Sequence, residues 1–156
     1  MTRFSNSLRR ALAVCALVLP VLSQPALGQE PDPIGTIKTT QGSTVVIRDA
    51  KRLPAAVGLA LRQGDILETG ANGSVGATLR DNGTIALGPN SVLTLDSFVF
   101  APAERKFGFA TKVAKGTALF TSGAIAKLAP DSVKIETPTG TIGVRGTRFL
   151  VKAEVN

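Results

Sequence analysis

From residue 34 onward, hydrophobic and polar residues alternate with a period of two along short stretches of the chain. Val75, Ala77 and Leu79 fall on one face of such a stretch, and Ile85 and Leu87 do the same in the next one. This alternation is typical of strands with one buried and one exposed face. The pattern predicts strands at 34–38, 43–48, 64–68, 74–79, 84–88 and 92–96, and it continues through Phe107, Phe109 and Val113.

Turn-forming residues separate the predicted strands at intervals of about ten residues. They stand at Gln63-Gly64-Asp65, Ala71-Asn72-Gly73, Asp81-Asn82-Gly83 and Gly88-Pro89-Asn90. Glycine, asparagine and proline at such places favour reversal of the chain. The apolar stretch 55–61 permits a short helical turn, which Pro54 and Gly58 oppose. The sequence therefore predicts an all-β fold: a β-roll or short β-solenoid of short strands, with a two-layer β-sandwich as the alternative.

The first 30 residues follow a different pattern. Basic residues come first, an apolar run follows at 11–22, and a small-residue site ends at Gly28. This order is that of a cleavable signal peptide, and the run is shorter than the about 20 apolar residues that a membrane helix needs. We therefore expect a periplasmic or secreted protein, cleaved near Gly28, with no transmembrane span in its mature form. The predicted organisation is a signal peptide at 1–28, a short tether at 29–33 and an all-β domain at 34–156.

Cys15 is the only cysteine of the chain, and it lies within the predicted signal peptide. The segment Leu12-Ala13-Val14-Cys15 loosely resembles a lipoprotein processing site. Val14 is bulky where such a site has a small residue, and too few residues separate Arg10 from Cys15 to form an apolar region. We therefore favour cleavage near Gly28, which leaves a mature chain without cysteine and without disulfides.

The charge of the chain gives little sign of a nucleic-acid partner. The net charge is +7, but Arg3, Arg9 and Arg10 lie in the predicted signal peptide, which leaves 15 basic against 11 acidic residues. Apart from Lys51-Arg52 and Arg105-Lys106, the basic residues are spread singly. Nucleic-acid binding proteins concentrate such residues into a patch or stripe. We therefore expect a mixed, solvated surface and no nucleic-acid binding.

The residue inventory leaves few candidates for catalysis. The chain has no His, and no Cys follows the predicted cleavage site. A His-dependent triad, thiolate chemistry and His or Cys zinc sites are therefore excluded. Asp65 with Glu68, or Asp81 with Asp96, could form carboxylate pairs, but Asp65 and Asp81 are more simply read as turn residues that cap backbone N–H groups. No dense acidic loop for calcium is present, so we expect no enzyme activity, no cofactor and no metal site.

Four motifs follow one another between residues 64 and 151. They are Gly64-Asp65-Ile66-Leu67-Glu68-Thr69-Gly70, then 79–91 with its Asp81-Asn82-Gly83-Thr84 hairpin and Gly88-Pro89-Asn90-Ser91 turn, then 115–123, and finally 137–149. In this order they resemble the motifs of the FecR domain. That family includes regulators of iron transport, whose periplasmic domain takes a signal from a TonB-dependent receptor. We expect no anti-sigma segment before the export signal, so the chain looks more like the stand-alone secreted members.

Arg145-Gly146-Thr147 in the last motif is the strongest candidate for a partner-binding site. Arg presents a planar fork to carboxylates and phosphates, and Gly lets a ligand approach the backbone. The structural alternative, which we favour, is a bend at Gly146 with Arg145 paired to an internal acid such as Glu136. The turn residues that characterise the other motifs are Gly64, Asp65, Asp81, Gly83, Gly88, Ser91, Gly116, Gly123, Thr137 and Pro138.

Two further predictions concern binding. Sugar sites commonly stack rings on Trp or Tyr, and both are absent, so we read Phe98, Phe100, Phe107 and Phe109 as core lining. The last strand, at 147–155, is predicted to lie at an open sheet edge, where it can pair with another chain. We expect a non-enzymatic binding or scaffold domain that engages a protein or an envelope polymer. The alternative is an accessory of extracytoplasmic signalling or iron-transport regulation that acts through a separate membrane protein.

Overall fold

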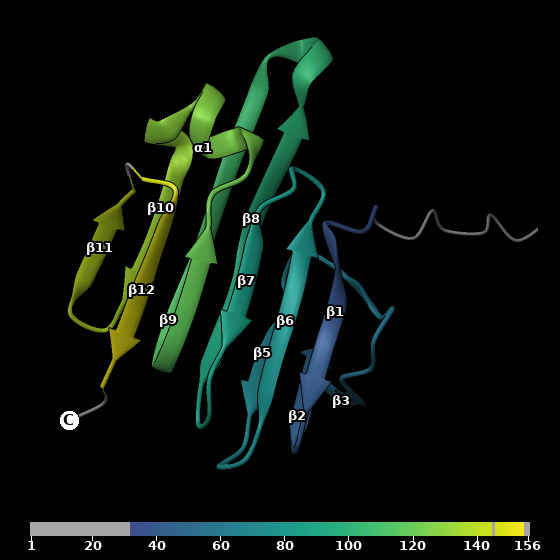
Figure 1. Cartoon of the computed structure of the whole chain (residues 1–156). Helices are drawn as coiled ribbons and strands as arrows, with labels where there is room; N and C mark the ends of the chain where they lie inside the picture. Colours follow the sequence, from purple (N-terminus) through teal and green to yellow (C-terminus); the bar gives the residue numbers. More distant parts are fainter. Residues whose placement is uncertain (1–31, 145, 155–156) are drawn as a thin grey trace, which may run out of the picture. The chain divides into compact units, whose positions relative to one another are not determined.

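A single sheet of twelve strands curls into an open half-barrel (Figure 1), which confirms the all-β prediction. The computed structural model describes residues 32–144 and 146–154. The predicted signal peptide, Cys15 and most of the tether lie outside these residues. The strands are β1 (Gly35–Gln41), β2 (Thr44–Arg48), β3 (Lys51–Pro54), β4 (Ala60–Leu61), β5 (Ile66–Thr69), β6 (Ser74–Leu79), β7 (Thr84–Leu87), β8 (Val92–Ala101), β9 (Lys106–Thr121), β10 (Val133–Thr137), β11 (Gly140–Gly143) and β12 (Arg148–Ala153).

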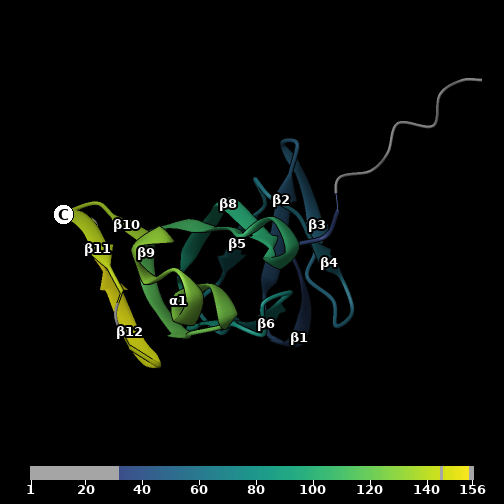
Figure 2. The ribbon, with the colours of Figure 1, turned by 90° about the horizontal axis from the view of Figure 1, so that it is seen from above.

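The curled sheet has two facing layers, seen from above in Figure 2. The front layer has the order β4, β1, β6, β7, the second half of β9, and β12. The back layer has the order β3, β2, β5, β8, the first half of β9, then β10 and β11. The long strand β9 joins the layers, because residues 106–115 pair with β8 whereas residues 118–121 pair with β7. The sheet is thus rolled, and its layers face each other as in a sandwich.

The chain passes between the layers at a row of corners at the lower end of Figure 1. Hydrogen bonds join neighbouring corners: Gly70 N–H donates to Ser43 O (2.8 Å), Asn90 N–H to Gly70 O (3.0 Å) and Gly88 N–H to Thr117 O (3.0 Å). Two strands and their corner form a V-shaped rung, and the rungs stack side by side. The rungs are β1 with β2, β5 with β6, β7 with β8, and the two halves of β9.

The segment from β3 to β4 is the last rung at one end of this stack, and we call this the closed end because a corner joins the two layers there. β3 pairs with β2 in the back layer, and β4 pairs with β1 in the front layer. Between them, Ala55 N–H donates to Thr44 O (3.1 Å) and Gly58 N–H donates to Ile37 O (2.9 Å). The short helical turn considered for 55–61 is therefore wrong, because these residues form the corner of a terminal rung.

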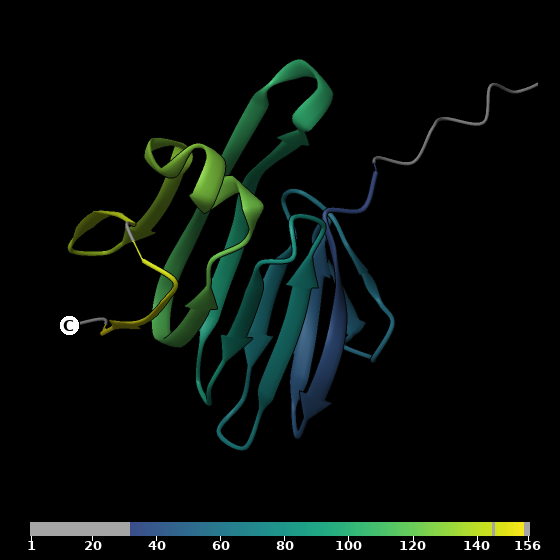
Figure 3. The ribbon, with the colours of Figure 1, turned by 45° about the horizontal axis from the view of Figure 1, so that its top comes forward.

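The core lies between the two layers and contains the predicted apolar faces. Val75, Ala77, Leu79, Ile85 and Leu87 are all buried, as the alternation predicts. A short helix that was not predicted, α1 (Ala124–Leu128), covers the upper end of the core and buries Ile125 (Figure 3). The short 3-10 turns η1 (Pro102–Glu104) and η2 (Pro130–Ser132) complete the connections between strands.

Candidate functional site

The predicted turn residues Gly88, Ser91 and Gly116 meet inside the corner row. Thr69 Oγ1 accepts the Ser91 N–H (2.9 Å) and donates to Gly88 O (2.7 Å). Ser91 Oγ in turn accepts the Thr117 N–H (2.9 Å). Gly116 has φ +85°, and a Cβ there would lie 2.2 Å from Ser91 Oγ. These residues lock three successive rungs together, so their place in the motifs has a structural explanation.

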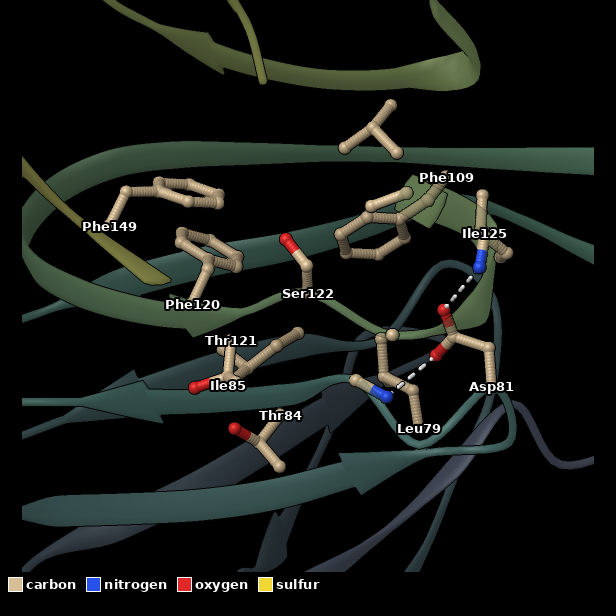
Figure 4. A pocket seen from close by; sticks show the side chains of 14 residues that line it. Leu79, Asp81, Thr84, Ile85, Phe109, Phe120, Thr121, Ser122, Ile125 and Phe149 are labelled. Atoms are coloured by element: carbon tan, nitrogen blue, oxygen red, sulfur yellow. Dashed lines mark hydrogen bonds between the residues drawn. The ribbon is translucent and has the colours of Figure 1, made fainter. Parts of the chain in front are cut away.

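Asp81, Gly83 and Gly123 form a second joint, between the β6–β7 hairpin and α1, and Figure 4 shows the Asp81 carboxylate with its two hydrogen bonds. The Asp81 carboxylate accepts the Gly83 N–H at Oδ1 (3.0 Å) and the Ile125 N–H at Oδ2 (3.2 Å). A Cβ on Gly123 would lie 2.3 Å from Asp81 Oδ2, so only glycine fits beside this carboxylate. Asp81 therefore caps both the β6–β7 hairpin and the start of α1.

The cavity beside Asp81 is too small for an organic ligand. Its volume is about 30 Å³, and its walls include the rings of Phe109, Phe120 and Phe149 (Figure 4). Pockets that bind organic ligands typically have volumes of about 300–1,000 Å³. The rings of Phe120 and Phe149 stack with their centroids 5.2 Å apart. The cavity is thus a packing gap beneath α1.

The four phenylalanines that were predicted to line the core lie on β8 and β9. Phe98 and Phe109 are buried and meet edge to face, with ring centroids 6.2 Å apart. Phe100 and Phe107 are partly buried, pack against the same core and have centroids 6.1 Å apart. The core interpretation is therefore confirmed, and no exposed aromatic platform for a sugar forms from these rings.

Asp65 and Glu68, considered as a carboxylate pair, are each engaged by a different arginine. Asp65, only 1% exposed, accepts both Nε (2.8 Å) and Nη2 (2.7 Å) of Arg48. The Asp65 carboxylate also accepts a hydrogen bond from the backbone N–H of Arg62 (2.8 Å). Glu68 pairs instead with Arg52 at the surface (3.1 Å). The predicted turn residue Asp65 thus fixes the loop before β5, and the arginine that holds it was missed at the sequence level.

Asp81 and Asp96 do not form a shared acidic site either. The Asp81 carboxylate accepts the two hydrogen bonds described above, whereas Asp96 is exposed on β8. Partial desolvation of its carboxyl group is the main cause that raises the pKa of Asp96, and the negative charge of Glu136 adds to it. The positive charge of Lys112 acts in the opposite direction. Among the described residues, no group of three or more His, Cys, Asp or Glu is arranged to hold a metal ion.

Much of the last motif lies at the surface, although Val144 is buried and Phe149 packs against the core. Thr137 Oγ1 donates to Gly140 O (2.9 Å) in the exposed turn at Pro138 between β10 and β11. Gly146 and Thr147 are exposed on the connection to β12, where the Ser122 N–H donates to Thr147 O (2.9 Å) and the Ser122 hydroxyl donates to Gly146 O. Arg145 lies outside the described residues. Packing therefore explains the residues of the corner motifs, whereas the exposed residues of the last motif remain accessible to a partner.

The end of the stack opposite β3 and β4 is open. Within 32–144 and 146–154, β12 pairs only with β9, and β11 pairs only with β10. Both strands stand at the left border of Figure 1. The predicted open edge is confirmed for 148–153, whereas Val155 lies outside the described residues.

The side chains of β12 alternate between core and solvent. Val151 and Ala153 are buried, while Arg148, Leu150 and Lys152 are exposed. Leu150 keeps 63% of its surface exposed, between two cationic side chains. Sequence reasoning located the edge but missed this pattern, although an apolar residue on an otherwise charged face is the signal that reveals it.

A family model described as FecR protein matches residues 65–156. The chain belongs to the FecR family. The match covers both joints described above, the corner row from β5 onward and the open end, so the resemblance seen in the motifs is confirmed. No curated protein and no solved structure gives a significant match.

The FecR match begins after the closed end of the stack. β1 to β4 precede Asp65 and lie outside the matched residues, whereas β5 to β12 lie within them. In the described part of this FecR domain, no helix is long and apolar enough to cross a membrane. Within the matched region, the exposed residues of the last motif and the unpaired edges of β11 and β12 form the candidate functional site.

Proposed function

We propose that this chain is a non-enzymatic binding or scaffold domain of the FecR family, exported to the periplasm or secreted after cleavage near Gly28. The observation that carries this proposal is the asymmetry of the stack. At one end the edge strands are protected, because β4 has only two residues and β3 has four and includes a proline, whereas at the other end β12 offers six residues without proline. Stacked-repeat proteins need a cap at each end, and an uncapped sheet edge is a template for another chain. A partner protein or an envelope polymer at this end would complete the domain.

The non-enzymatic role rests on the residues available and on how they are used. The chain has no His. The buried carboxylates of Asp65 and Asp81 are held by an arginine and by backbone N–H groups. General acid–base catalysis needs a group that is free to exchange a proton with a bound substrate. Turnover of an envelope substrate by the purified protein would overturn this part of the proposal.

Membership of the FecR family favours a second candidate function, an accessory in extracytoplasmic signalling or iron-transport regulation. The chain would then act through a separate membrane protein. Genes for a sigma factor and a TonB-dependent receptor next to its own gene would support this candidate. Their absence, together with unchanged expression of iron-transport genes after deletion, would argue for a scaffold role instead.

The binding function is tested by capture followed by reconstitution. The full chain is expressed with its own export segment and an affinity tag inserted after Glu30, far in sequence from β12. Proteins captured from the envelope fraction are identified, purified and titrated against the domain. We expect at least one partner that binds saturably and that a urea-unfolded sample does not bind. If every captured protein fails to bind in purified form and no envelope polymer binds saturably, the binding proposal is wrong.

A further inference from the structure

The edges of this sheet are protected to different degrees. At the closed end, β3 has four residues and includes Pro54, and β4 has only two residues. Proline and short length both hinder pairing with another strand. β12 is longer, pairs with β9 along its whole length without a bulge and contains no proline. The other open edge strand, β11, has only four residues, two of which are glycine. Among the described edge strands, β12 is therefore the one best prepared to accept another strand.

The exposed face of β12 has a defined chemical pattern. Arg148, Leu150 and Lys152 follow one another along it. In the pairing register, Leu150 lies opposite Leu119 of β9, so the two side chains share one face of the sheet. The pattern is thus a small apolar patch between two cations. Lys152 contacts Glu154 (2.5 Å), and both of these side chains are exposed, so solvent screens the pair.

A second copy of this chain fits that pattern poorly. Antiparallel pairing of two β12 strands about Leu150 would place Arg148 of one copy opposite Lys152 of the other. Like charges directly opposite each other destabilise a strand pair. The charges of β12 therefore disfavour pairing with a second copy of β12 and favour pairing with an acidic strand.

The distribution of charge along the chain points to the same class of partner. Residues 106–154 contain eight Lys and Arg but only three Asp and Glu. These residues build β9 to β12, the strands at the open end of the stack. Complementary potentials speed association and fix the register of a bound segment.

We propose that the outer edge of β12 binds an extended acidic strand of a partner protein. Backbone hydrogen bonds would extend the front layer by one strand. Acidic side chains of the partner would lie beside Arg148 and Lys152, and an apolar side chain between them would cover Leu150. This inference rests on the proposed binding function and names the site and the chemistry of its partner.

The test is a charge exchange between peptide and protein. Two short peptides of otherwise identical threonine-rich sequence carry Glu, Leu and Glu, or Lys, Leu and Lys, at alternate positions. Each is titrated into the full exported chain by calorimetry. We expect the Glu peptide to bind at least about tenfold more tightly than the Lys peptide, which corresponds to about 1.4 kcal/mol. The double variant Arg148→Glu, Lys152→Glu should reverse this preference, and both positions are exposed, so the fold is retained.

A matched control separates the site from the net charge. Lys38→Glu with Lys51→Glu makes the same change of charge on β1 and β3, at exposed positions. This variant should keep the wild-type preference for the Glu peptide. Equal affinity for both peptides, or a reversal in the control variant as well, would contradict the proposal. So would unchanged binding of a Glu peptide methylated on its backbone nitrogens, because such a peptide cannot pair as a strand.

The same variants distinguish failure of this inference from failure of the binding function. A reconstituted envelope partner that binds the Arg148→Glu, Lys152→Glu variant as well as the wild type would leave the function intact and place the site elsewhere. Selective peptide binding without any envelope partner would support the edge site and count against the function.

Discussion

Gly116→Ala is the substitution whose cost reports most directly on the corner row. Gly116 stands where β9 bends from the back layer to the front layer, with φ +85°. Gly64 has nearly the same backbone conformation, with φ +88°, but a Cβ there would meet nothing within 4 Å. Gly64→Ala is therefore a matched control that carries the conformational cost without the steric one.

The expected magnitudes follow from these two environments. A left-handed conformation costs an L residue about 1–2 kcal/mol, which is the whole loss expected for Gly64→Ala. At Gly116, a Cβ would also lie 2.2 Å from Ser91 Oγ and 2.7 Å from Asn90 O. Overpacking of this kind costs about 1–3 kcal/mol, and loss of the Ser91 hydrogen bond to the Thr117 N–H adds about 1 kcal/mol. We expect Gly116→Ala to lose about 4 kcal/mol.

Urea unfolding followed by far-ultraviolet circular dichroism measures both losses, because the chain has no Trp or Tyr to report by fluorescence. A loss of about 4 kcal/mol is a large fraction of the about 5–15 kcal/mol that stabilises a typical domain. The Gly116→Ala variant should therefore unfold at much lower urea than the Gly64→Ala variant. Equal midpoints for the two variants would refute the argument that successive corners are packed in contact.

Three further predictions concern carboxylates. Asp65→Ala should lower the free energy of unfolding by about 3 kcal/mol, measured in urea, because it removes the buried carboxylate that pairs with Arg48. Arg52→Ala breaks an exposed ion pair and should lower it by less than about 1 kcal/mol. Asp81→Ala should cost about 2 kcal/mol by removing the acceptor for two N–H groups, and a loss below about 0.5 kcal/mol would count against the cap. Because the pKa of Asp96 is raised, its own contribution to stability is lost as pH rises from below 3.8 through that pKa. Relative to the wild type, Asp96→Asn should therefore gain stability as pH rises through this range, which unfolding midpoints of both proteins measured across the acid range will show.

Much of the fold follows from local pattern. The alternation at Val75, Ala77 and Leu79 placed β6 at its observed bounds, because the side-chain period of a strand is fixed by its geometry. The turn residues likewise marked the places where the chain reverses. Local signals of this kind need no knowledge of the rest of the molecule.

Long-range partners were not predictable in the same way. Arg48 lies 17 residues from Asp65, and nothing local to either residue indicates that they meet. The terminal rung at 55–61 was also missed, because its conformation depends on hydrogen bonds to the distant residues Thr44 and Ile37. Sequence separation therefore hid the pair of Arg48 with Asp65 and the terminal rung, whereas the exposed pattern of β12 is local and could have been read from the alternation along 148–153.

Amide hydrogen exchange tests the open edge most directly. Exchange is measured residue by residue on the full chain, with and without the Glu peptide. Amides of β12 should gain protection on binding, while those of β3, at the closed end of the stack, should not change. Protection that appears at β3 or is spread evenly over the sheet, with none at 148–153, would contradict binding at the β12 edge.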